Sequence, residues 1–186
     1  MSGKTQYCTA STLDGFIAGP GHTLDWLLQF DDAELDGFDD FLSEVGALAM
    51  GSHTYEWVLR HAVGPEADDP QPWPYSQPAW VFSSRDLPGV DDADVRFVEG
   101  DVAGPHRAMV EAADGKNVWI VGGGDLAGQF HDAGLLDEMI IEIVPVTLGE
   151  GFPVFPRRLA DRRMRLLSAT ERGPGFVALH YEVARP

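Results

Sequence analysis

The most constraining feature of this sequence is an apolar run that ends in three glycines and continues into a helical pattern. Residues 118–121 are apolar, residues 122–124 are glycines, and Leu126 and Phe130 then share one helical face. This order brings backbone amides and the positive end of a helix close to a phosphate group. It equally fits a tight turn between a core strand and a helix, because the full G-x-G-x-x-G spacing is absent. Both interpretations stay open on this segment alone.

Short apolar runs alternate with helical patterns along most of the chain. The expected strands cover residues 7–10, 15–18, 47–50, 79–82, 95–98, 118–121 and 139–144. Helices are expected at 31–45, where Asp31 and Asp32 suit the first turn, after Met50 with Ser52 or Thr54 as the cap, and at 105–113. Residues 64–78 are rich in proline and read as a surface loop.

The last two apolar runs, 164–170 and 176–183, flank a turn signal at 171–175 and predict a hairpin. Together these patterns predict one α/β domain over residues 1–186. Its central sheet is mostly parallel, helices flank it, and the antiparallel hairpin closes it at the C-terminal end. The length of 186 residues and the 44% hydrophobic content suit a single packed core.

Composition excludes several classes of function. The net charge of −17 argues against nonspecific binding to nucleic acid or to anionic membranes. The single cysteine, Cys8, excludes a disulfide framework and a cysteine zinc site, and His22 and His53 lack metal-ligand spacing, so no metal site is expected. No apolar run is long enough to span a bilayer and no signal-peptide pattern is seen, so we expect a cytoplasmic protein.

Three expected strands end in residues suited to anion binding. Met50 precedes Gly51-Ser-His-Thr, Phe82 precedes Ser83-Ser-Arg, and Val121 precedes the three glycines. Because carboxyl ends of parallel strands share one edge of a sheet, these ends predict a cradle for a dinucleotide pyrophosphate and an extra phosphate.

Arg85 and a run of five arginines near the C-terminal end can each be interpreted in two ways. Arg85 is either a clamp on a ribose phosphate or an exposed surface arginine. Five arginines within residues 157–165 form either a solvated loop that balances nearby acids or a binding patch.

The chain resembles the dihydrofolate reductase fold, and more closely the reductase domain of the bacterial riboflavin-biosynthesis deaminase-reductase and its stand-alone relatives. The resemblance covers nearly the whole chain and rests on five motifs in the family's order. These are Ser11-Thr-Leu-Asp-Gly-Phe-Ile-Ala, Met50-Gly-Ser-His-Thr, Phe82-Ser-Ser, Ile120-Val-Gly-Gly-Gly and Val144-Pro-Val-Thr-Leu-Gly-Glu-Gly with Pro153 and Phe155.

The resemblance implies NADPH as hydride donor, with NADH not excluded, and a homodimer. It implies that Ile17 and Ala18 line the nicotinamide site, and that the peptide bond between Gly122 and Gly123 is cis. The remaining cofactor contacts that it implies are Gly51, Ser52, Thr54, Ser83, Ser84, Arg85, Val121, Gly122, Gly123, Gly124, Asp125 and Leu126.

The activity that the resemblance implies is that of 5-amino-6-(5-phosphoribosylamino)uracil reductase in riboflavin biosynthesis. Alternatives are a reductase of a pterin, folate or other small heterocycle, and a noncatalytic nucleotide-binding protein. Hydride transfer leaves charge on the accepting group, so a nearby proton donor is needed. The candidates are Asp14 and Asp25, with Asp25 expected to lie half-buried beside Trp26; Trp26 and Thr147 are the candidate substrate contacts. The alternative is that Asp25 caps a short helix and Trp26 fills the core.

Overall fold

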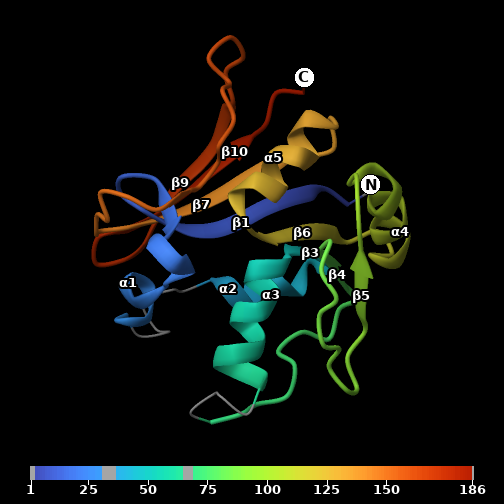
Figure 1. Ribbon diagram of the computed structural model, residues 1–186. Helices are drawn as coiled ribbons and strands as arrows, with labels where there is room; N and C mark the ends of the chain where they lie inside the picture. The colour runs from blue at the N-terminus through green and yellow to red at the C-terminus, as the bar shows by residue number, and fades with distance from the viewer. Residues whose placement is uncertain (1–2, 31–36, 65–68, 186) are drawn as a thin grey trace.

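The computed structural model describes residues 3–30, 37–64 and 69–185 of the chain. Its main element is an eight-stranded sheet in the order β5-β4-β3-β6-β1-β7-β10-β9 (Figure 1). The strands are β1 (Thr5–Thr12), β3 (Val45–Gly51), β4 (Ala79–Phe82), β5 (Val95–Val98), β6 (Asn117–Gly122), β7 (Glu138–Val144), β9 (Arg165–Gly173) and β10 (Phe176–Glu182).

The strands from β5 to β7 pair in parallel, and β10 pairs antiparallel with both β7 and β9. The predicted fold class, a mostly parallel sheet closed by an antiparallel hairpin, is confirmed. A second, two-stranded sheet joins β2 (Phe16–Ala18) to β8 (Phe152–Pro153). This small sheet ties the segment after β1 to the segment after β7.

Helices cover both faces of the sheet (Figure 1). One face packs against α4 (Ala103–Ala112) and α5 (Gly124–Asp132). The other face carries α1 (Asp25–Leu28), α2 (Phe38–Ser43) and α3 (Ser52–Val58), and α3 continues into a π-helical turn over Leu59–Val63. A 3-10 turn spans Pro20–His22. Among the described residues, no helix combines the length and the apolar character needed to cross a bilayer.

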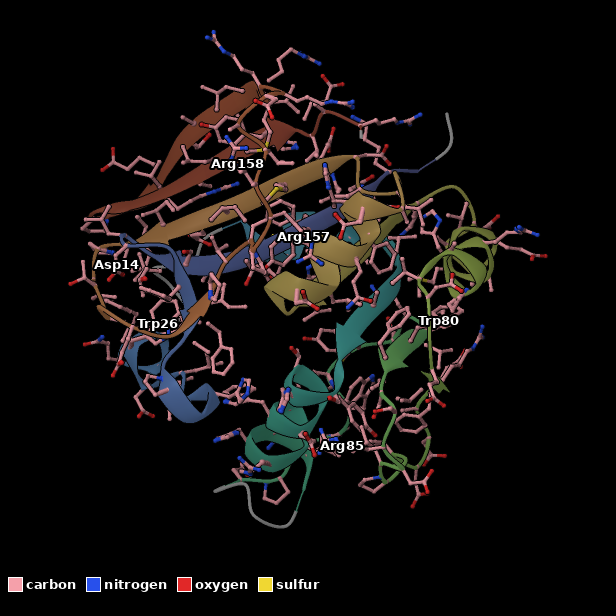
Figure 2. All side chains as sticks on the ribbon, turned by 45° about the horizontal axis from the view of Figure 1, so that its top comes forward. Asp14, Trp26, Trp80, Arg85, Arg157 and Arg158 are labelled. Carbon is pink, nitrogen blue, oxygen red and sulfur yellow. The ribbon has the colours of Figure 1, made fainter. Side chains whose placement is uncertain are left out.

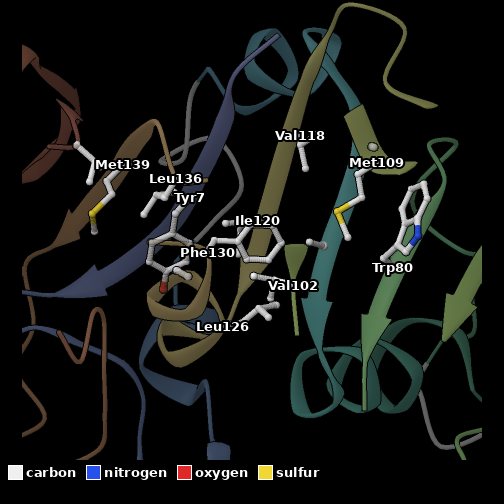
Figure 3. Packing of buried hydrophobic residues seen from close by; sticks show 14 of the residues in the cluster. Tyr7, Trp80, Val102, Met109, Val118, Ile120, Leu126, Phe130, Leu136 and Met139 are labelled. Carbon is white, nitrogen blue, oxygen red and sulfur yellow. The ribbon is translucent and has the colours of Figure 1, made fainter. Parts of the chain in front are cut away.

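The largest core cluster lies between the sheet and the pair α4 and α5 (Figure 3). Ile120 of β6 and Phe130 of α5 are fully buried at its centre, and Leu126 packs beside them. The shared helical face of Leu126 and Phe130 is therefore a core face, which fixes α5 against the sheet directly after the three glycines. Burial of these side chains orients the first turn of α5 toward the carboxyl edge of the sheet.

Several boundaries differ from those predicted. The predicted helix over 31–45 corresponds to α2, but Val45 begins β3 because it is buried in a core cluster; Asp31, Asp32 and Leu35 lie outside the described residues. Neither Ser52 nor Thr54 caps α3; Gly51 is the N-cap and no side chain bonds to it. β9 extends to Gly173, so the hairpin turn is shorter than the predicted 171–175.

The proline-rich segment also differs in part from a purely exposed loop. Within its described part, Trp73 and Tyr75 pack against the core cluster that contains Tyr55 and Trp119. Tyr75 meets Trp119 edge to face, with ring centroids 5.8 Å apart. These aromatic contacts fix the segment against the sheet face that α1, α2 and α3 cover.

Candidate active site

A cleft of about 560 Å³ opens at the carboxyl edge of the sheet. Pairing of β1 with β6 ends at Tyr7 and Ile120, whereas pairing of β1 with β7 continues to Thr12 and Val144. The sheet therefore separates between β1 and β6 at this edge, where ligands bind in open α/β folds. The cleft is lined by nearly all of the predicted cofactor residues: Ile17, Ala18, Gly51, Ser52, Thr54, Val121, Gly122, Gly123, Gly124, Asp125 and Leu126.

The first turn of α5 faces this cleft with no side-chain cap. Gly123 is the N-cap residue, its backbone is extended, and no side chain bonds to the first N–H groups of the helix. Gly124, Asp125 and Leu126 also line the cleft. Their amides and the positive end of the helix are suited to a phosphate group.

The surroundings that a side chain would meet differ among the three glycines. A Cβ on Gly124 would lie 2.5 Å from the backbone oxygens of Pro153 and Val154, and a Cβ on Gly122 would lie 2.9 Å from Oγ1 of Thr54. A Cβ on Gly123 would meet only Ile17, at an ordinary 3.8 Å. Packing against backbone thus requires a glycine at 124, a side chain at 122 would displace the Thr54 hydroxyl, and Gly123 leaves an open surface toward the cleft. The Gly122–Gly123 peptide bond is cis, as expected.

Asp125 lines the cleft but is held by its neighbours. Its carboxylate accepts hydrogen bonds from Gln129 and Arg157, both at 2.9 Å, and these bonds lower its pKa. Arg157 also donates to Asp132 at 2.7 Å, and Figure 2 shows it beside α5. Arg165 pairs with Glu182. For these two arginines the structure favours the interpretation that the basic run balances nearby acids.

Ser83, Ser84 and Arg85 do not line the cleft, although Phe82 before them does. Ser83 Oγ accepts from the backbone N–H of Arg85 and donates to its carbonyl, so this turn satisfies itself. The Arg85 guanidinium makes a two-bond ion pair with Glu56 of α3, at 2.8 and 2.6 Å. A phosphate bound by Arg85 would have to share the guanidinium with this carboxylate.

The predicted proton donors lie outside the cleft. Asp14 is exposed and accepts hydrogen bonds from the Thr12 hydroxyl and from the amides of Gly149 and Leu148, which lower its pKa. In this arrangement Asp14 fastens the loop after β7. Asp25 is exposed, so the expectation that it is half-buried is wrong; it is the first residue of α1, and Leu24 is the N-cap.

The two predicted substrate contacts are also separate from the cleft lining. Trp26 is buried against Val144 and Phe176, which agrees with the core-filling alternative, and its Nε1 has no partner among the described residues. Thr147 is exposed in the loop after β7. Figure 2 shows Asp14 and Trp26 on the side of the molecule away from Arg85.

Two histidines at the cleft were not predicted as site residues. His22 stacks on His53 with ring centroids 4.0 Å apart and on Phe152 at 3.9 Å, and all three residues line the cleft. Burial and the neighbouring His53 lower the pKa of His22. His22 and His53 are 31 positions apart in the sequence, so no local spacing indicates this stack. No group of three or more metal-ligating side chains occurs within 3–30, 37–64 and 69–185.

A larger cavity of about 790 Å³ lies along another side of α3 and its π-helical turn. Its walls include Leu59, Trp73 and Val90. Neither glycine-rich strand end, nor the first turn of α3 or of α5, contributes to these walls. Of these two cavities in the described part of the chain, the strand-end cleft is therefore the one that includes the first turns of α3 and α5.

The fold and this cleft define a dihydrofolate-reductase-like α/β protein. Dihydrofolate reductase from Enterococcus faecalis, complexed with NADP(H) and RAB-propyl, aligns over 98% of this chain and 97% of its own, with 16% identity and a TM-score of 0.64. A deaminase/5-amino-6-(5-phosphoribosylamino)uracil reductase from Thermotoga maritima aligns over 98% of this chain and 57% of its own, with 14% identity and a TM-score of 0.64.

The chain belongs to the RibD C-terminal domain family, whose model matches residues 4–178. It is 31% identical to the uncharacterized protein YwjB of Bacillus subtilis, over 97% of this chain and 98% of that protein. A putative riboflavin biosynthesis protein from Shewanella sp. PV-4 is 28% identical, with a TM-score of 0.77 over 98% of this chain and 99% of the other. The family resemblance inferred from the five motifs is confirmed.

Proposed function

We propose that the protein is a reductase that uses NADPH to reduce a ribosylaminopyrimidine of the 5-amino-6-(5-phosphoribosylamino)uracil type. The observation that carries this proposal is the uncapped first turn of α5, which opens with Gly123 into the strand-end cleft. Membership of the RibD C-terminal domain family and the names of the Shewanella and Thermotoga proteins support the substrate class.

The cleft residues fit a nicotinamide dinucleotide. The amides of Gly124, Asp125 and Leu126 would hold the pyrophosphate, and the open surface at Gly123 lets it approach the backbone. Ile17 and Ala18 offer an apolar wall for the nicotinamide ring. When bound, the cofactor supplies the hydride for the reduction.

Calorimetric titration with NADPH tests the cofactor site, and Gly123→Ala is the matched variant. Its methyl group would project toward the cleft without a steric clash, so we expect the variant to fold and to bind NADPH at least tenfold more weakly, which is about 1.4 kcal/mol. The control is Gly104→Ala in α4, where a Cβ meets nothing within 4 Å. Wild-type protein without measurable NADPH or NADH binding would refute the reductase proposal.

Substrate assays separate the alternatives. NADPH oxidation with the ribosylaminopyrimidine supports the proposed activity, oxidation with dihydrofolate alone favours a pterin reductase, and binding without oxidation favours a nucleotide-binding protein. Each outcome is read by the loss of absorbance of the reduced nicotinamide.

We further propose a homodimer that pairs the β9 strands of two copies. β9 is an edge strand, and its Leu166 and Leu167 are 51% and 37% exposed. Antiparallel pairing centred on Ser168 would place Arg165 opposite Glu171 of the second copy, so the strand is complementary to itself in charge. Sedimentation equilibrium should give a dimer for the wild type and a monomer for Leu166→Asp. A monomeric wild type would contradict this interface.

A further inference from the structure

Glu142 of β7 is half-buried on the sheet face that α1 and α2 cover. Its register partners are Ala10 on β1 and Ala178 on β10, and directly paired residues point to the same face. Two residues along the strand, Val144 packs against Trp26 of α1. Because both flanking side chains are single methyl groups, neither neighbour within the sheet covers the carboxyl group of Glu142.

This carboxyl group lacks the partners that a buried acid needs. Its Oε1 is buried and has no hydrogen-bond partner among the described residues. Among the described residues, the ionisable groups that interact with it are Arg172 of β9 and Cys8 of β1; further along the strands, His180 of β10 is bonded to Glu138. Burial raises the pKa of Glu142. The positive charge of Arg172 opposes this rise only in part. Glu142 therefore holds its proton closer to neutral pH than an exposed glutamate does.

Glu142 is not part of the cleft lining, but it lies on the sheet face onto which the cleft opens. Leu24, which precedes α1, and Trp57 and Val58 of α3 line the cleft, and α1 and α3 both cover the sheet face that carries Glu142. β7 is two strands from β6, which corresponds to about 10 Å across the sheet. A substrate the size of a pyrimidine with an attached sugar spans that distance.

We propose that Glu142 is a catalytic residue that contacts the substrate and gives it the proton required for reduction. This inference rests on the proposed reductase function. Opening of the ribose ring breaks the bond between C1' and the ring oxygen, moves the amine proton to that oxygen and forms a C=N bond at C1'. Reduction of this C=N bond adds one hydride to carbon and one proton to nitrogen. The bound nicotinamide cofactor is oxidised as the hydride donor, and the Glu142 O–H bond breaks as the new N–H bond forms. The carboxylate that remains is stabilised by Arg172 and takes a proton back from water.

The decisive variant is Glu142→Gln, which keeps the size of the side chain but cannot supply the proton. We expect single-turnover reduction of the ribosylaminopyrimidine to slow by about 100-fold or more, while the Kd for NADPH changes less than twofold. Glu142→Asp should recover part of the rate and keep the pH profile. The control is Glu111→Gln on α4, an exposed acid that should reduce at the wild-type rate.

A second readout does not depend on turnover. In protein labelled with ¹³C at the glutamate carboxyl carbons, the resonance that disappears in Glu142→Gln should titrate above the ordinary glutamate value of about 4.3. Titration at or below that value, or a Glu142→Gln rate within threefold of wild type, would overturn the proposal.

The two proposals fail in distinguishable ways. Absence of NADPH binding in the wild type removes the reductase function itself. If NADPH binds and the wild type reduces the substrate, only the Glu142 variants bear on the donor. If NADPH binds but neither the ribosylaminopyrimidine nor dihydrofolate is reduced, the substrate class is wrong, and the carboxyl titration alone decides whether Glu142 holds a proton as proposed.

Discussion

The two ends of the parallel strands differ in whether their polar groups have partners within the protein. At the amino-terminal end, Glu138 is buried and accepts hydrogen bonds from Lys4, from Gln6 at 2.7 Å and from His180 at 3.0 Å. Four residues further along the same strand and on the same face, Glu142 has a buried oxygen with no described partner. The first turn of α5 is likewise uncapped.

The same difference appears in the pKa values of the two glutamates on β7. Burial raises the pKa of Glu138, but the bonds from Lys4, Gln6 and His180 outweigh it and the net pKa is lowered. At Glu142 burial prevails and the pKa is raised. Polar groups that satisfy one another hold the amino-terminal end together, whereas at the carboxyl-terminal edge the Glu142 oxygen and the first turn of α5 lack side-chain partners among the described residues.

The largest expected effect is on stability at the amino-terminal end. Glu138→Gln removes the charge that Lys4 and His180 face, and we expect a loss of about 2 kcal/mol in the free energy of unfolding at pH 7, measured by urea denaturation. Because the pKa of Glu138 is lowered in the folded state, its stabilisation is present above the unfolded pKa and is lost as the pH falls through the folded pKa. The deficit of the variant should therefore shrink in acid. Glu182→Gln, which breaks an exposed ion pair with Arg165, is the control. A deficit that stays constant with pH would contradict the network.

The second effect concerns cofactor choice at the carboxyl-terminal edge. If Arg85 binds the extra phosphate of NADPH, Arg85→Ala should lower the preference for NADPH over NADH by about tenfold. Glu56→Gln should raise that preference, because it removes the carboxylate that shares the guanidinium. Calorimetric Kd values for both nucleotides decide this. An unchanged ratio in both variants would show that Arg85 is only a surface arginine.

The third effect is on stability and concerns Glu142 of β7. Glu142→Gln removes an ionisable group whose folded pKa is raised, so the wild type pays a penalty that grows as the pH rises through that pKa. We expect the variant to be more stable by about 1 kcal/mol near neutral pH and equal to the wild type in acid, as measured by urea denaturation. Destabilisation at neutral pH would mean that Glu142, like Glu138, serves the fold.

The smallest effect concerns the stack at the cleft. The folded pKa of His22 is lowered, so its neutral form stabilises the fold above the unfolded pKa of about 6.5 and this stabilisation is lost as the pH falls. His22→Phe keeps an aromatic ring between His53 and Phe152 but does not titrate. Between pH 7.5 and 5 its Tm should fall by about 1–2 °C less than that of the wild type. An identical fall would show that the protonation of His22 does not affect stability.

The strand-end cleft could be predicted because its signals are local in sequence. Gly51 and Gly123 each follow a strand and precede a helix, so one window of residues contains the strand, the turn and the helix start. Most of the fold follows from the same short-range periodicity. The cis bond between Gly122 and Gly123 was predicted from the family resemblance and not from residue spacing.

The surroundings of Glu142 could not be predicted in this way because pairing between distant segments of the chain creates them. Glu142 reads as an acid within an apolar strand, and only its register with Ala10 and Ala178 shows that nothing in the sheet covers it. Asp14, within the motif over residues 11–18, and Asp25, beside Trp26, were the predicted donors, but the fold leaves both exposed. The partner of Arg85 was equally hidden, since Glu56 is 29 residues away.

Amide hydrogen exchange with and without NADPH tests whether the strand-end cleft binds the cofactor. We expect slower exchange at Gly124, Asp125 and Leu126 when NADPH is bound, with no change at Gln6 and Glu138 at the opposite end of the strands. The same experiment reports on the larger cavity lined by Leu59 and Trp73. Protection there and not in the first turn of α5 would contradict the assignment of the strand-end cleft as the cofactor site.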